Sequence, residues 1–345
     1  MKQKHFILGC ERSGTTWLSN ILDSHPAVEF FMEPFAEYAK ILPDFPHRNV
    51  YIPKSNENLY QYINEGFKNL YKLKYPLFYR RDKKLFFKAI DRYLIGTLKS
   101  LYSIFHSYPP LRVSQYRALN LNSSKIPFKF QSRKNARCNV EFIKELRLNF
   151  KIPILSEIFP DSVFLVTIRH PGAQLTSILN LFKKGNLYEL QGAIKSFFQY
   201  VQNNARFEKY NELIADPLLK KDPETYIILW WLINYEVLIE DLKYHKSKYK
   251  LIYCEELSED PFGITDEVFK FCKLPFDENV SKYIKFSSSS NKSHFAPIET
   301  NRDSKIYHKR KIGEVEKSLQ NKIKKIFSVY KPMPEVLKAF ENFSK

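Results

Sequence analysis

The chain has 345 residues, 44% hydrophobic and 27% charged, which is typical of a globular protein large enough for one to three domains. It contains no run of 18 uncharged apolar residues and no signal-peptide pattern, so we expect no membrane-spanning helix and a cytoplasmic location. The formal net charge of +18 indicates anionic partners, the alternative being a solvated lysine-rich surface.

Residues 5–22 predict a strand, a glycine-bounded loop and a helix in direct succession. His5–Leu8 is apolar and suits a buried strand, Gly9 and Gly14 bound the loop, and from Thr15 to Leu22 apolar residues recur at helical spacing. In such a unit the free backbone N–H groups and the positive end of the helix dipole point at one place. We therefore predict that the loop holds an anion.

The residues inside the loop indicate which kind of anion it holds. Gly9 and Gly14 have the spacing of a Walker A loop, but Thr15-Thr16 stand where that motif has Lys-Ser or Lys-Thr. Arg12 instead supplies a cation from inside the loop. The expected ligand is therefore not the magnesium triphosphate of an ordinary ATPase, and an ordinary strand-to-helix turn is the alternative.

Two short runs in this region carry a resemblance to a known family. They read Arg-Ser-Gly-Thr-Thr-Trp-Leu over residues 12–18 and Leu-Asp-Ser-His-Pro over residues 22–26. Together they resemble the 5′-phosphosulfate loop of sulfotransferases that use 3′-phosphoadenosine 5′-phosphosulfate (PAPS), and the carbohydrate and tyrosylprotein branch most of all. The resemblance implies PAPS as co-substrate, PAP as product, and donor binding by Arg12, Ser13, Gly14, Thr15, Thr16 and Trp17.

Three further apolar runs predict buried strands, at Val140–Ile143, Val163–Ile168 and Leu251–Tyr253. Helical patterns separate them, which predicts a parallel sheet with helices on both faces. We expect an α/β, P-loop-like three-layer fold with a central parallel sheet, in one domain over residues 1–345. Ligands bind beyond the carboxyl ends of such strands, so the charged residues found there mark the expected site.

The run Val163–Ile168 leads into the clearest of these strand ends. Arg169 follows it, Pro171 fits the first turn of a helix, and Ser177 lies about two turns into that helix. An arginine fork and a hydroxyl that converge suit a phosphate. In the resembled family this Arg-x7-Ser pattern is the 3′-phosphate site, although His170 stands where the family usually has Asp. Pairing of Arg169 with a surface carboxylate is the alternative.

Other strand ends extend the resemblance. Lys144 resembles a strand-end lysine that lies near the sulfuryl group in the tyrosylprotein enzymes, and a surface lysine is the alternative. Residues 251–257 resemble the family's strand-Tyr-Glu-Asp-Leu segment, with Cys254 at the tyrosine position, so the usual adenosine contact is not predicted. Residues 309–317 resemble the basic loop that closes over PAPS, with Arg310, Lys311 and Gly313 as donor-binding residues; a solvated charge run is the equal alternative.

Sulfuryl transfer needs a base for the acceptor hydroxyl and cations for the moving sulfuryl group. Glu33 is the predicted base, because its apolar neighbours in Phe30–Pro34 would raise the pKa of a carboxyl group by desolvation. Its separation from Arg12 also resembles the arginine-to-glutamate spacing of the tyrosylprotein branch. Arg12 and Lys144 are the predicted catalytic cations. His25 is a rival base, but its place after the first helix favours a turn.

Residues 57–118 predict a helical insertion, in which apolar residues recur at helical spacing from Lys83 to Phe105 among lysines and arginines. Such a stretch either packs on the domain as a lid, which we favour, or lies on an anionic membrane, which would place the protein at the inner membrane surface. Its aromatic and basic residues are expected to line the acceptor groove.

We predict a sulfotransferase whose acceptor is a hydroxyl of a carbohydrate or glycolipid. Four scattered cysteines without a Cys-x-x-Cys pair favour neither a metal site nor a disulfide framework, and no nucleic-acid partner is expected. Two other classes stay open. A nucleotide-dependent kinase is disfavoured by the missing lysine after Gly14, and a non-catalytic polyanion-binding protein is permitted only by the charge. The sequence carries no signal for the oligomeric state.

Overall fold

The computed structural model describes residues 3–35, 45–54, 57–68, 70, 74–76, 129–131, 140–183, 188–202, 204–215, 222–288, 315 and 317–341. The strands in this part of the chain are β1 (Gln3–Leu8), β2 (Val28–Met32), β3 (Lys74–Pro76), β4 (Lys129–Gln131), β5 (Val140–Lys144), β6 (Val163–Ile168) and β7 (Lys248–Tyr253). The first helices are α1 (Thr15–Asp23), α2 (Glu57–Lys68), α5 (Ile152–Ile158), α6 (Pro171–Lys183), α7 (Tyr188–Val201), the 3₁₀ helix η3 (Ala205–Tyr210) and α8 (Asn211–Ala215). They are followed by α9 (Pro223–Tyr244), α10 (Cys254–Glu259), α11 (Pro261–Phe271), α12 (Glu278–Ser288), α14 (Lys317–Tyr330) and α15 (Pro334–Glu341).

Five strands form a central sheet in the order β2-β5-β1-β6-β7, and every neighbouring pair is parallel. This confirms the expected α/β fold and the four predicted strands. It also contains β2, which is not among the predicted strands and appears in the sequence prediction only as the apolar setting of Glu33. A run of five residues, four of them aromatic, β-branched or methionine, was the available signal for a strand.

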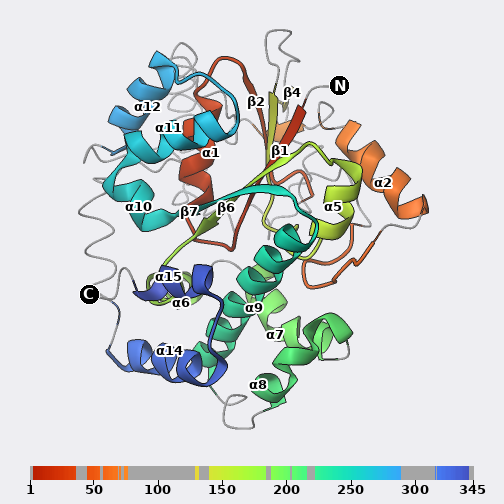
Figure 1. Cartoon of the computed structure of the whole chain (residues 1–345), viewed down its shortest axis with the longest axis vertical. Helices are drawn as coiled ribbons and strands as arrows, with labels where there is room; N and C mark the ends of the chain where they lie inside the picture. Colours follow the sequence, from red (N-terminus) through yellow and green to blue (C-terminus); the bar gives the residue numbers. More distant parts are fainter. Residues whose placement is uncertain are drawn as a thin grey trace, which may run out of the picture.

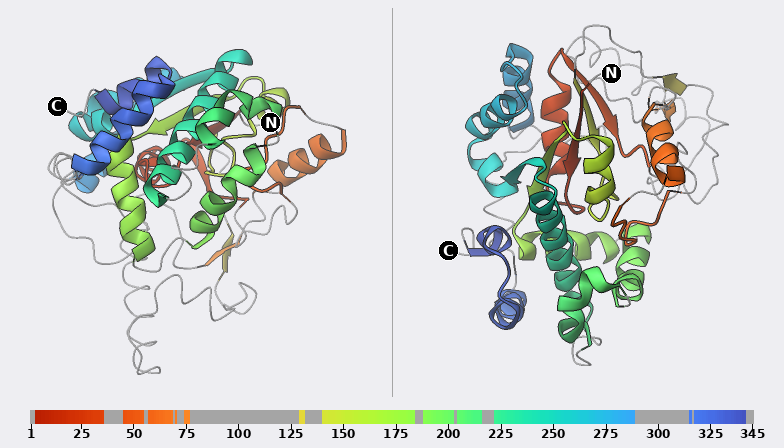
Figure 2. Two further views of the ribbon diagram at one scale, coloured as in Figure 1. Left: turned by 90° about the horizontal axis from the view of Figure 1, so that it is seen from below. Right: turned by 45° about the vertical axis from the view of Figure 1, so that its right-hand side comes forward.

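The sheet lies between two helical layers (Figures 1 and 2). Successive residues of a strand point to opposite faces, so Phe6 and Leu8 of β1 enter one buried cluster and Ile7 enters the other. The cluster around Ile7 is closed by α1, α10, α11 and α12. The larger cluster is closed by α2, α5, α6, α7, α8, α9, α14 and α15. Because both faces are covered, β6 and the last three residues of β1 and β7 are continuous apolar runs, Thr167 apart.

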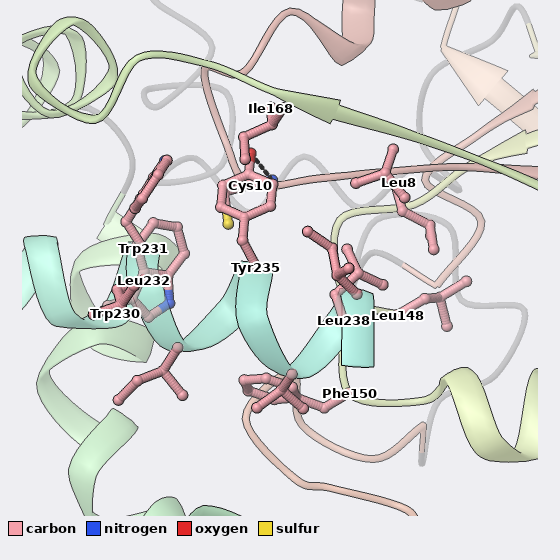
Figure 3. Packing of buried hydrophobic residues seen from close by; sticks show 14 of the residues in the cluster. Leu8, Cys10, Leu148, Phe150, Ile168, Trp230, Trp231, Leu232, Tyr235 and Leu238 are labelled. Atoms are coloured by element: carbon pink, nitrogen blue, oxygen red, sulfur yellow. Dashed lines mark hydrogen bonds between the residues drawn. The ribbon is translucent and has the colours of Figure 1, made fainter. Parts of the chain in front are cut away.

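The long helix α9 supports the sheet from the larger cluster. It begins after Asp222, whose side chain accepts the N–H of Glu224, with Pro223 in the first turn. Most of its side chains are buried, including Tyr235, which projects toward Cys10 after β1 and Ile168 at the end of β6 (Figure 3). α9 therefore connects the core directly to the loop that follows β1.

The structure describes only parts of the predicted helical insertion. α2 is a helix, with Ile63 and Phe67 buried on the larger cluster, whereas Lys83–Phe105 lies outside the described residues. Residues 74–76 of this stretch form the short strand β3, which pairs antiparallel with β4. Pro76 suits a strand edge better than a helix interior, because proline lacks the N–H that a helix interior needs. Among the described helices, none is both long and apolar enough to cross a membrane.

Candidate functional site

The carboxyl ends of the parallel strands bring the predicted site residues to one edge of the sheet. Gly9 follows β1, Glu33 follows β2, and Lys144 ends β5. Arg169 follows β6 and Cys254 follows β7. Residues from distant parts of the chain thus meet where a doubly covered parallel sheet binds its ligands.

The loop after β1 has a backbone that only particular residues tolerate. Gly9 has φ 143°, and a Cβ there would lie 2.6 Å from the carbonyl oxygen of Thr167. Gly14 has φ 92°, and a Cβ there would lie 2.6 Å from Cys254 Sγ. α1 begins directly after Gly14, so the first N–H groups of the helix, beginning with Thr15, have no intrahelical acceptor and point toward the loop. The loop is therefore shaped to receive an anion.

Hydrogen bonds fix this loop to the core. The Ser13 hydroxyl donates to the Cys10 carbonyl (2.7 Å) and lies 2.8 Å from Thr167 Oγ1, while the Ser13 N–H also donates to Cys10 (3.2 Å). The Cys10 N–H donates to the Tyr235 hydroxyl (3.2 Å; Figure 3), and this hydroxyl donates to the Thr167 carbonyl (3.0 Å). Both donors of Ser13 are thus engaged within the protein, and we assign this residue to the shape of the loop.

Two other predicted donor-binding residues occupy different surroundings. Trp17 is buried in the cluster around α1, and its indole N–H donates to Ser287 Oγ (3.0 Å). Thr16 is half-buried at the start of α1. The indole therefore contributes to packing against α12, whereas the backbone around Thr16 stays at the positive end of the helix.

Arg169 has the geometry of an anion-binding group. Only 3% of this residue is exposed, and its Nη1 donates to the Arg12 carbonyl (3.0 Å). Its Nε lies 4.0 Å from Glu255 Oε1, and neither Nε nor Nη2 has a hydrogen-bond partner among the described residues. Buried N–H groups without partners are costly and rare. A surface carboxylate does not pair with Arg169, because Glu255 is itself buried.

Arg12 connects the two predicted halves of the donor site. Its carbonyl accepts from Arg169, and its exposed guanidinium donates through Nε to Ser177 Oγ on α6 (3.0 Å). The sequence pattern predicts that Ser177 acts together with Arg169, whereas in the structure the Ser177 hydroxyl accepts from Arg12. Arg12 has φ 71°, a left-handed conformation that is unusual for a residue other than glycine. Its side chain reaches α6 in this conformation. All three residues therefore lie around one point.

Glu33 and Lys144 form an ion pair at the ends of β2 and β5. The Lys144 ammonium contacts Glu33 Oε1, and the Glu33 N–H donates to the Lys144 carbonyl (2.6 Å). Lys144 is 2% exposed, so it is not a surface lysine. The apolar setting expected for Glu33 is wrong. Phe30, Phe31 and Met32 point into the two cores, while the carboxylate faces Lys144 and lies 3.8 Å from Arg147 Nη1.

A second carboxylate supports this pair. Glu145 is fully buried; its Oε2 accepts the Phe35 N–H (2.9 Å), and its Oε1 accepts from the backbone N–H and Nη1 of Arg147 (3.2 and 2.9 Å). Burial raises the pKa of Glu145, against the opposing effect of Arg147. Glu145 therefore fixes the chain on both sides of Glu33. Neither Glu145 nor Arg147 is among the site residues that the sequence predicts.

His25 does not lie at this edge. It follows the C-terminal end of α1, about 13 Å along the helix axis from the loop. Its Nδ1 accepts the Ala27 N–H (3.1 Å), its Nε2 lies 3.1 Å from the Pro275 carbonyl, and burial lowers its pKa. The residue holds a turn, as its sequence position indicated, and is excluded as the base in this conformation.

The predicted basic loop lies outside the described residues, so the structure does not place Arg310, Lys311 and Gly313. The nearest described residue, Val315, is buried against the first turn of α6, where its Cγ1 would lie 2.7 Å from a Cβ on Gly172. Within the described part of the chain, no three potential metal-ligating side chains lie together.

Comparison with known proteins gives a family match. A sequence profile described as "Sulfotransferase family" matches residues 5–278, and no curated protein sequence matches the chain. Among solved structures, the chain is similar to a sulfotransferase domain from the curacin biosynthetic pathway (16% identity, 96% of this chain and 99% of that chain, TM-score 0.46). It is also similar to a sulfotransferase domain from the Synechococcus PCC 7002 olefin synthase (16%, 96% and 97%, 0.41) and to sulfotransferase STF9 from Mycobacterium avium (13%, 96% and 78%, 0.39). All three TM-scores are below 0.5, so the family assignment depends on the sequence match.

Proposed function

The chain belongs to the sulfotransferase family and is therefore a sulfuryl-transferring enzyme, and we propose that it uses PAPS as donor and a carbohydrate or glycolipid hydroxyl as acceptor. One observation carries the donor assignment. Two buried guanidinium nitrogens of Arg169, Nε and Nη2, have no hydrogen-bond partner within the described residues and lie beside the loop that opens α1. A phosphate accepts such N–H groups through charge-assisted hydrogen bonds.

The two halves of the site match the two anionic ends of this donor. The backbone of the loop and the start of α1 would hold the 5′-phosphosulfate, with Arg12 as the cation. Arg169 would hold the 3′-phosphate. Ser177 touches Arg12 and so fixes the guanidinium between both ends. No group in this arrangement requires a metal ion, because the charges to be neutralised face arginine and backbone N–H groups.

The bound donor supplies the sulfuryl group, and the residues of this chain supply the proton transfer and the charge stabilisation. Glu33 would accept the proton of the acceptor hydroxyl. In the resting protein its carboxylate contacts the Lys144 ammonium, so the proposed base and a cation lie side by side. When Glu33 becomes neutral, it no longer holds the ammonium of Lys144, and this positive charge becomes available to the sulfuryl and leaving-phosphate oxygens. Proton transfer and charge stabilisation are thus coupled through one ion pair.

The acceptor class is supported by the sequence alone. Residues 57–118 are rich in aromatic and basic side chains, and aromatic faces suit sugar rings. Assay of a panel of sugars, glycolipids, phenols and peptides with labelled PAPS tests this assignment. Transfer to phenols or peptides but not to sugars would reject the carbohydrate acceptor and leave the donor assignment intact.

Calorimetric titration tests the donor assignment. PAP should bind about ten- to a hundredfold more tightly than AMP, because a charge-assisted pair to Arg169 is worth about 1.5–3 kcal/mol. Binding should survive EDTA, and ATP and an oligonucleotide should bind weakly. In Arg169→Gln the preference for PAP over AMP should disappear while AMP affinity stays near its original value. Equal affinities for PAP and AMP in the unmodified protein would reject PAPS as donor.

A further inference from the structure

We propose that Glu255 takes up a proton when the 3′-phosphate of the donor nucleotide binds Arg169, so that this residue sets how donor affinity depends on pH. The inference rests on the proposed function, because it requires a 3′-phosphorylated nucleotide at Arg169. Glu255 is a positioning residue in this account: it acts on the donor only through the guanidinium.

The contacts of Glu255 leave half of its carboxylate without a partner. The residue is 2% exposed and is the second residue of α10. Its Oε1 accepts the His170 N–H (3.1 Å), whereas Oε2 has no hydrogen-bond partner among the described residues. Arg169 Nε lies 4.0 Å from Oε1, which is too long for a hydrogen bond. A buried anionic oxygen without a donor is costly, and a neutral carboxyl group costs less.

The charged and titratable groups around Glu255 do not compensate for this burial. They are Arg169 after β6, His170 in the same turn, Cys254 and Glu256 on α10, and Lys338 on α15. Burial lowers the pKa of His170 to about 4 and raises the pKa of Cys254 to about 12, so both side chains are neutral near pH 7. Lys338 is paired with Glu256 (2.9 Å). The negative charge of Glu256 raises the pKa of Glu255 and so opposes its ionisation.

Of the groups that favour the ionised carboxylate in the free protein, Arg169 has the largest effect, and backbone N–H groups, among them that of His170, add to it. Burial nevertheless outweighs these effects and raises the pKa of Glu255 to about 7. A phosphate at the free N–H groups of Arg169 brings up to two negative charges close to the carboxylate, and like charges favour the neutral form. Glu255 then accepts one proton from solvent as the nucleotide binds.

The sign of the pH dependence follows from this linkage. Below the pKa of the free protein Glu255 is already protonated, so binding requires no proton uptake. Above it, each pH unit lowers the affinity for the 3′-phosphate by up to about tenfold, until the pKa of the complex is reached. The second ionisation of the phosphate, with a pKa near 6, acts in the opposite direction, so the effect is clearest from pH 7 to 8.5.

Calorimetry in pairs of buffers with different ionisation enthalpies counts the protons directly. For PAP we expect a proton uptake that rises through neutral pH and approaches one proton per nucleotide bound. The affinity for PAP should fall about three- to tenfold between pH 7 and 8, because the pKa of Glu255 in the free protein is raised to about 7. AMP should show neither effect. Glu255→Gln keeps an oxygen for the His170 N–H and should abolish both the uptake and the loss. The matched control Glu256→Gln should keep both.

The outcomes separate this inference from the proposed function. A preference for PAP over AMP that is constant with pH, with no proton uptake in the unmodified protein, would overturn the role of Glu255 and leave the donor assignment standing. Persistence of the full uptake in Glu255→Gln would also overturn it. Equal binding of PAP and AMP at every pH would reject the donor assignment itself, and the inference with it. Because the proton count is made on the unmodified protein, a variant that fails to fold does not remove the test.

Discussion

Replacement of Glu33 by glutamine tests the proposed chemistry most directly. The amide has nearly the same shape as the carboxylate but cannot accept the proton of the acceptor hydroxyl. Turnover should fall by about 10²–10⁴, the usual contribution of a general base. Affinity for PAP should stay nearly unchanged, because the donor is held by the loop and Arg169 and not by Glu33.

The structure also predicts a cost in stability. Lys144 is almost fully buried and pairs with the Glu33 carboxylate, and breaking a buried pair from one side costs about 3–5 kcal/mol. The Glu33 side chain is 16% exposed and Arg147 lies 3.8 Å away, so we expect a smaller loss of about 2–3 kcal/mol. Denaturant unfolding of the variant gives this value. Turnover of Glu33→Gln and of the unmodified protein should therefore be compared well below the unfolding temperature of the variant.

A double variant separates the two effects. In Glu33→Gln with Lys144→Met no unpaired charge stays buried at this position, so stability should recover in part while turnover stays low. Glu29→Gln, on the same strand β2 but away from its carboxyl end, is the matched control and should keep normal turnover. Near-normal turnover in Glu33→Gln, measured with labelled PAPS, would refute the assignment of the base. Another base, including one from the predicted insertion at residues 57–118, would then have to be tested.

Three further predictions follow from the loop and the buried histidines. Arg12→Ala should weaken PAP binding and lower turnover together, since it removes the guanidinium that lies beside Ser177 at the proposed donor site; turnover loss without any change in affinity would contradict this role. Gly14→Ala should lower stability and PAP affinity for two reasons: its Cβ would lie 2.6 Å from Cys254 Sγ, and φ at this position is 92°. The double variant with Cys254→Ala should relieve the contact but not the backbone strain. Full recovery of stability in urea unfolding of the double variant would argue against that strain. Burial lowers the pKa of His5 and of His170 to about 4, below the unfolded value of 6.5, so their stabilising effect is complete above pH 6.5 and is lost as the pH falls toward 4. Each contributes up to about 3 kcal/mol, and His170→Gln should reduce the acid-induced loss in unfolding free energy by that amount; an unchanged loss would contradict it.

The sequence predicted those features that depend on neighbouring residues. Gly9, Arg12 and Gly14 gave the loop, because positive φ angles and a strand-to-helix junction are local properties. The apolar runs of β1, β5, β6 and β7 gave the sheet, since strands buried on both faces stand out without alternation. Parallel connection then placed the residues after these strands at one edge.

The electrostatic environment of each site residue could not be predicted in this way. The neighbours of Glu33 in sequence predicted apolar surroundings for its carboxylate. Those neighbours point into the two cores, and the carboxylate contacts Lys144, 111 residues away in sequence. Ser177 followed Arg169 at a family spacing, yet its hydroxyl contacts Arg12 across the turn between β6 and α6. Glu255 gave no sign of its burial, which comes from the packing of α10 beneath the turn at His170.

The sequence by itself therefore determined the loop at Gly9–Gly14, the parallel sheet and the family of this chain. Only the tertiary structure decided which charges face one another. The reason is physical: hydrophobic periodicity reports which face of an element is buried, whereas ion pairs and pKa shifts depend on distances and burial that are set by the order of strands in the sheet. In this protein β2 and β5 are far apart in sequence but pair in the sheet, and this pairing brings Lys144 into contact with the Glu33 carboxylate.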